Sequence, residues 1–98
     1  MNLPIVLRPE ARSDVAAARE WYDAKGTNLG QRFLDELDRL FQRIRAYPEL
    51  YATALGNVRR ARTRRFPYVV YYRILSEKIE VVAVLHGRRD PKIWQRRM

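Results

Sequence analysis

Five arginines occupy the seven positions from residue 59 to residue 65, the densest run of charge in the sequence. A guanidinium group binds a phosphate or a carboxylate through two parallel hydrogen bonds, so these side chains could hold an anion. On an extended strand, alternate arginines would share one face about 7 Å apart, where their repulsion is costly without an anion nearby. A charged run is more often a solvated strand face, but this density favours a binding role. The residues predicted to bind a polyanion or an acidic protein are Arg59, Arg60, Arg62, Arg64 and Arg65.

His86 is the only residue whose side chain ordinarily titrates near neutral pH, and Gly87, Arg88 and Arg89 follow it directly. One interpretation makes the imidazole a general acid or base beside arginines that bind phosphate. The other makes it a structural residue that hydrogen-bonds the backbone and orders the turn after a strand. Both interpretations place the histidine at the end of an apolar segment.

The composition predicts no metal site, no cofactor and no membrane partner. The chain has no cysteine and one histidine, which leaves too few ligands for a zinc site. The first residues lack the features of a signal peptide, and no apolar stretch approaches the ~20 residues that span a bilayer. We therefore expect a cytoplasmic protein.

The net charge of +9 is concentrated in the second part of the chain. Residues 1–56 carry eight basic and eight acidic side chains, whereas residues 57–98 carry twelve basic and three acidic ones. Such asymmetry indicates an acidic protein or polyanionic partner. At 98 residues, 47% of them hydrophobic, the chain has room for one core, so residues 1–98 are expected to form a single domain.

Two helices are predicted ahead of the arginine cluster. Residues 9–25 begin with Pro9 and end before Gly26, with an apolar stripe that Trp21 broadens. Residues 28–48 give the stronger helix, with capping-box spacing between Asn28 and Gln31 and an end at Pro48. The apolar stripe of this second helix comprises Leu29, Phe33, Leu37, Leu40, Phe41 and Ile44.

The remaining segments read as strands. Residues 4–9 predict a short edge strand bounded by prolines. A loop around residues 51–57 is followed by an arginine-rich strand over residues 59–65 and an aromatic strand over residues 68–75. Residues 79–86 are almost all apolar, which predicts a central strand, and Asp90 and Pro91 could begin a short terminal helix. The fold class is therefore α+β in the order β-α-α-β-β-β, with the helical hairpin on one face of a small, mainly antiparallel sheet and a short C-terminal extension.

This order, with the segments "AREWY", "LGQRFLDEL", "RRFPYVVYYRI" and "VVAVLHGRRDPKIW", resembles the RelE/ParE superfamily of type II toxin–antitoxin toxins. The resemblance covers almost the whole chain. It implies a bacterial toxin held inactive by a cognate antitoxin with an acidic, amphipathic segment. RelE-like members cleave messenger RNA on the ribosome without a metal, whereas ParE-like members inhibit DNA gyrase.

The resemblance also assigns candidate residues to the two branches. A RelE-like nuclease would use Arg60, Arg62, Arg88 and His86, but Trp94 falls where the nucleases have a tyrosine, and Tyr68 falls where they have a strand arginine. Both departures fall at catalytic positions, so the ParE-like branch is favoured, with no catalytic residue and with Arg88, Arg89 and Trp94 binding the target. The arginines at 59–65 would then bind the antitoxin. Open alternatives are the ribosome-dependent endoribonuclease and, more weakly, a basic nucleic-acid-binding domain.

Overall fold

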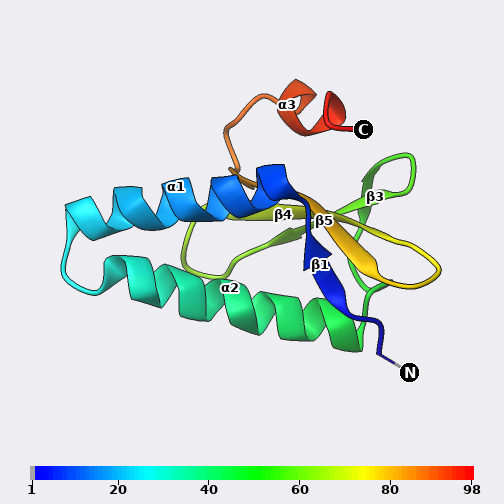
Figure 1. Cartoon of the computed structure of the whole chain (residues 1–98), viewed down its shortest axis with the longest axis horizontal. Helices are drawn as coiled ribbons and strands as arrows, with labels where there is room; N and C mark the ends of the chain where they lie inside the picture. Colours follow the sequence, from blue (N-terminus) through cyan, green and yellow to red (C-terminus); the bar gives the residue numbers. More distant parts are fainter. Residues whose placement is uncertain (1) are drawn as a thin grey trace.

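The computed structural model describes residues 2–98 as a five-stranded sheet that carries two long helices on one face and a short helix on the other (Figure 1). The α+β class predicted from the sequence is confirmed. The elements in chain order are β1 (Ile5–Leu7), α1 (Pro9–Lys25), α2 (Leu29–Ala46), β2 (Thr53–Leu55), β3 (Val58–Arg62), β4 (Tyr68–Ile74), β5 (Ile79–His86) and α3 (Lys92–Gln95).

The strands lie in the order β1-β5-β4-β3-β2, with β1 parallel to β5 and the other neighbours antiparallel. The predicted edge position of β1 and central position of β5 are both confirmed. The short strand β2 was expected to be loop, because its exposed residues give no apolar alternation to mark it. It pairs with β3 and forms the second edge of the sheet.

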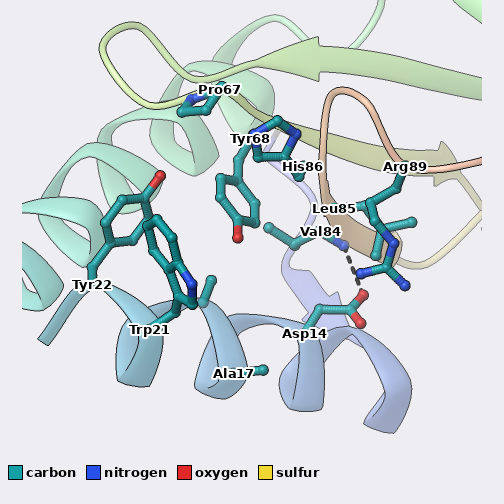
Figure 2. Close-up of a pocket in the computed structure, with 11 residues that line it drawn as sticks. Asp14, Ala17, Trp21, Tyr22, Pro67, Tyr68, Val84, Leu85, His86 and Arg89 are labelled. Atoms are coloured by element: carbon teal, nitrogen blue, oxygen red, sulfur yellow. Dashed lines mark hydrogen bonds between the residues drawn. The ribbon is translucent and has the colours of Figure 1, made fainter. Parts of the chain in front are cut away.

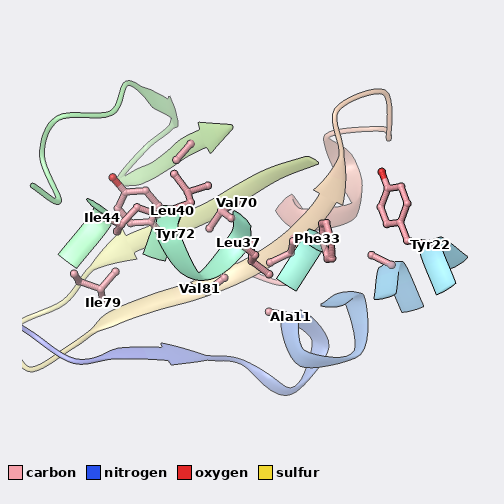
Figure 3. Close-up of a cluster of buried hydrophobic side chains, with 13 residues drawn as sticks. Ala11, Tyr22, Phe33, Leu37, Leu40, Ile44, Val70, Tyr72, Ile79 and Val81 are labelled. Atoms are coloured by element: carbon pink, nitrogen blue, oxygen red, sulfur yellow. The ribbon is translucent and has the colours of Figure 1, made fainter. Parts of the chain in front are cut away.

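The main core lies between the helical hairpin and the sheet (Figure 3). The predicted stripe of α2 supplies Phe33, Leu37, Leu40 and Ile44, all buried. Tyr72 of β4 joins this core, while the adjacent Tyr71 points to the opposite face, as strand alternation requires. Trp21 was expected to widen the stripe of α1, but it is 54% exposed and lies under the Lys25 ammonium instead.

The turn between the two helices differs from the predicted capping box. Asn28 precedes α2 in the left-handed region, at φ 63°, and its side chain forms no capping hydrogen bond. Gln31 donates to Asp35 one turn further on rather than reaching back. Asparagine tolerates this backbone conformation better than most residues, so Asn28 serves the turn through its φ angle.

A second, smaller core covers the opposite face of the sheet. The residues from α3 and the strands that form it are Val58, Val69, Tyr71, Val82, Ala83, Leu85 and Trp94. The Trp94 ring stacks on Tyr71 with centroids 4.9 Å apart and planes at 21°. The C-terminal extension is therefore part of the packed structure, and the sheet is covered on both faces.

Candidate functional site

The sequence suggested that alternate arginines of the cluster share one face of a strand. The structure differs from this prediction. β3 ends at Arg62, and Arg64 and Arg65 lie in the loop that leads to β4. The loop forms because the Thr63 backbone N–H donates to the Tyr68 carbonyl and the Thr63 hydroxyl donates to the Phe66 carbonyl. The cluster is thereby divided between a strand and a turn.

Arg60 and Arg62 share the sheet face that carries α3. Arg60 pairs directly with Tyr71 across the sheet, and Arg62 pairs with Val69. Both side chains are exposed, and Arg60 lies opposite Tyr71, whose ring stacks on Trp94. Positive charge is therefore presented on this face over two aromatic rings that are themselves buried.

Arg59 points to the other face and has a structural role that its sequence position did not suggest. Its Nη1 atom donates to the Tyr51 carbonyl at 2.6 Å and to the Glu49 carbonyl at 3.2 Å. These bonds fasten the segment between α2 and β2 to the sheet. Arg59 was predicted to bind an anion with its neighbours, but its guanidinium is already engaged with two backbone oxygens.

His86 forms the backbone hydrogen bond that the structural interpretation expected. Its Nδ1 atom accepts the Arg88 N–H at 3.1 Å, which orders the turn after β5. An Nδ1 that accepts requires the proton of a neutral imidazole to sit on Nε2.

The His86 ring lies against Tyr68 in a pocket between α1 and the ends of β4 and β5 (Figure 2). The pocket has a volume of about 560 Å³, and Trp21, Tyr22 and Arg89 also line it. Burial raises the pKa of Tyr22 and of Tyr68, so both phenols stay protonated at neutral pH. The pocket therefore offers neutral hydroxyls and an apolar wall, and its lining includes one cation, Arg89, and one carboxylate, Asp14.

The four residues matched to a nuclease do not all lie together. His86 lines the pocket beside α1, and Arg88 follows it in the exposed turn. Arg60 lies on the sheet face that carries α3, and Arg62 lines a separate hollow beside α2. A base and the cations that stabilise its phosphate must meet at the same group, within hydrogen-bond reach. Arg60 and His86 lie on opposite faces of the sheet, so these two residues do not meet at one group.

The C-terminal segment places its candidate residues in different environments. Arg88 and Arg89 are exposed in the turn after β5. Trp94 is only 3% exposed, so its indole anchors the segment, and its ring offers almost no surface to a partner. Its Nε1 atom has no hydrogen-bond partner within residues 2–98.

An ion pair between Asp14 and Arg97 anchors the end of the chain and was missed from the sequence. The two side chains meet through two hydrogen bonds, of 2.6 and 3.0 Å, although 83 residues separate them. No local pattern could predict this pairing. The one signal was an acidic residue within the apolar stripe of α1, between Ala11 and Ala18.

Metal and membrane features are absent from the part of the chain that the structure describes. Across residues 2–98, no three histidine, aspartate or glutamate side chains are grouped so that they could hold a metal ion. None of the helices described there has the length and apolar character to cross a membrane.

The fold is shared with a solved structure. It superposes with a TM-score of 0.75 on a solved structure described as the chromosomal ParDE TA system from P. aeruginosa, at 14% identity. The superposition covers 86% of this chain and 95% of that chain. At this identity the likeness concerns the fold alone.

The sequence comparison gives the family. The family of ParE toxins of the type II toxin–antitoxin system parDE matches residues 5–91, and the chain belongs to this family. Toxin ParE2 proteins of two Mycobacterium tuberculosis strains, CDC 1551 / Oshkosh and ATCC 25618 / H37Rv, are 34% identical over 65 residues. That match covers 58% of this chain and 62% of the relatives, less than two thirds of their length.

Proposed function

We propose that this chain inhibits DNA gyrase in the cytoplasm by binding to it, and that a cognate antitoxin neutralises it. Membership of the ParE toxin family supports the toxin role. The observation that carries the binding mechanism is the position of Arg60 on the opposite face of the sheet from His86. A binding inhibitor does not need these residues to meet at one phosphate, whereas a nuclease does.

The turn after β5 is the proposed target-binding surface. Arg88 and Arg89 are exposed there, and the His86 side chain holds the backbone that presents them. Trp94 contributes by fixing the following segment on the sheet through its stack on Tyr71. Because several residues would share the binding energy, each single substitution is expected to remove only part of it.

The antitoxin is proposed to use a separate set of basic residues. Arg60 and Arg62 are exposed, and neither forms an ion pair among residues 2–98. An acidic partner segment would neutralise them and reach them quickly through electrostatic attraction. The partner's sequence is expected to be acidic and amphipathic.

The test measures both candidate activities with the same purified chain. One assay follows supercoiling by DNA gyrase, and the other follows cleavage of messenger RNA in a translating extract. We expect inhibited supercoiling, intact messenger RNA, and a mild effect of His86→Ala. Rapid cleavage of ribosome-bound messenger, lost in a folded His86→Ala protein, would establish the endoribonuclease and reject the proposal.

A further inference from the structure

A second hollow lies between α2 and the loop that joins β3 to β4. Its volume is about 540 Å³, and it is more polar than the pocket beside His86. Arg39 and Arg43 line it from α2, and Arg62, Arg64 and Arg65 line it from the end of β3 and the loop. Five arginines thus surround one concave surface.

The only carboxylate in the lining belongs to Glu36, which is 7% exposed. This carboxylate accepts the backbone N–H of Arg65, which fixes the loop against α2. Its second oxygen lies 4.0 Å from Nη2 of Arg39, at the limit of an ion pair. Glu36 therefore shapes the hollow but leaves four positive charges without a counterion among the residues that line it.

Arginines that line one hollow repel one another, and an anion in the hollow would relieve the repulsion. Because the loop is closed by Thr63 and tied to α2 by Glu36, the arginine-bearing backbone is ordered before any partner arrives. Binding an anion would then cost little ordering of the chain. The hollow has the features of a preformed anion site.

We propose that this hollow receives acidic side chains of the antitoxin, a statement that rests on the antitoxin partnership proposed above. Leu40 and Tyr51 also line the hollow, so it offers apolar contacts beside the arginines. A glutamate side chain matches this combination, since its methylene groups pack on apolar surface and its carboxylate pairs with a guanidinium. The antitoxin partnership proposed above favours an acidic protein segment over a nucleic-acid phosphate, which the test includes as the competing occupant.

The test uses the full-length chain from cell-free synthesis and a fluorescent hexaglutamate peptide, with fluorescence anisotropy as the readout. The variant Arg43→Gln/Arg64→Gln removes two charges from the hollow. The matched control Arg12→Gln/Arg32→Gln removes two charges from exposed positions of α1 and α2 outside it. Thermal melts of both variants verify the fold.

We expect the hollow variant to weaken peptide binding about tenfold or more, because charge-assisted hydrogen bonds are lost. The control should weaken it less than about threefold, through net charge alone. Equal losses in the two variants would show general attraction and overturn the proposal. So would an oligothymidylate of equal charge that binds more tightly than the peptide and depends on Arg43 and Arg64. Neither result involves gyrase, so this proposal and the proposed target can fail independently.

Discussion

Asp14 connects three parts of the molecule that are far apart in the sequence. From α1, its Oδ2 atom accepts the Val84 N–H of β5 at 3.0 Å and binds Nη1 of Arg97. Arg97 in turn donates to the Val82 carbonyl at 3.2 Å. These backbone groups lie beyond the part of β5 that pairs with β1, which ends at Val81. The Asp14–Arg97 ion pair thus supplies hydrogen-bond partners for two backbone groups of β5 that β1 does not reach, and it fastens the C-terminus.

Asp14→Ala should therefore destabilise the fold and release the C-terminal segment. The side chains of Asp14 and Arg97 are only 11% and 16% exposed, and the substitution leaves a partly buried guanidinium without its partner. We expect a loss of roughly 1.5–3 kcal/mol in the free energy of unfolding, measured by urea denaturation. Arg19→Ala is the control, because its 3.6 Å contact with Asp23 joins two half-exposed side chains and is worth less than about 1 kcal/mol. Equal effects of the two substitutions would contradict this role.

Tyr72 should make the stability of the fold sensitive to alkaline pH. Its side chain is fully buried, its hydroxyl donates to the Pro48 carbonyl at 2.7 Å, and burial raises its pKa to about 12 from 10.0. Because the folded state holds this proton more tightly, the contribution is complete below pH 10 and is lost as pH rises toward 12. Urea denaturation at pH 9, 10 and 11 should show a steeper fall for the native chain than for Tyr72→Phe. Tyr47→Phe, at an exposed phenol, serves as control and should leave the slope unchanged.

At the scale of elements, the sequence predicted those parts whose burial follows a regular period. The stripe of α2 and the apolar run of β5 each face a core, so both were readable from spacing. The strand β2 and the end of β3 could not be predicted in this way. Pairing at an exposed sheet edge forms β2, and hydrogen bonds from side chains to the backbone shape the loop that ends β3. The short helix α3 was expected, but its packing on the sheet depends on contacts across the fold.

The hairpin of α1 and α2 depends on a close approach at Gly30. A Cβ atom at this position would lie 2.0 Å from Oδ1 of Asp23 and 3.0 Å from the Arg19 carbonyl oxygen. The carboxylate can rotate away, but the backbone oxygen moves only with α1, so Gly30→Ala should force the helices apart. We expect a loss of about 1–3 kcal/mol of stability, from the balance of overpacking against better helix propensity. Chemical denaturation measures it.

The double variant Gly30→Ala/Asp23→Ala separates the two clashes. Removal of the carboxylate relieves the nearer contact and leaves the backbone contact, so the double variant should recover part of the loss. Full recovery would assign the effect to the carboxylate alone, and a Gly30→Ala protein as stable as the native chain would show that the helices do not need the approach.

At the scale of the whole molecule, the sheet divides the basic residues into distinct surfaces. Arg60 lies on the face with α3, whereas Arg62, Arg64 and Arg65 line the hollow beside α2, and Arg88 and Arg89 occupy the turn after β5. The sequence could predict that the second part of the chain is basic. It could not predict this division. Two arginines of the hollow, Arg39 and Arg43, come from α2 in the first part of the chain, and the role of Glu36 is visible only in its contact with the loop.

Two charge-matched variants should separate neutralisation from toxicity. Arg60→Glu/Arg62→Glu and Arg88→Glu/Arg89→Glu change the net charge equally, at exposed positions where little stability is at stake. The first should slow antitoxin association about tenfold and reduce its salt dependence, while gyrase inhibition persists. The second should weaken gyrase inhibition, while the antitoxin still binds. Surface association kinetics and supercoiling assays on both proteins measure these effects, with thermal melts to verify the fold. Because the two variants carry the same charge, a loss of both activities in each would mean that one continuous basic surface serves both partners, and the proposed division would be wrong.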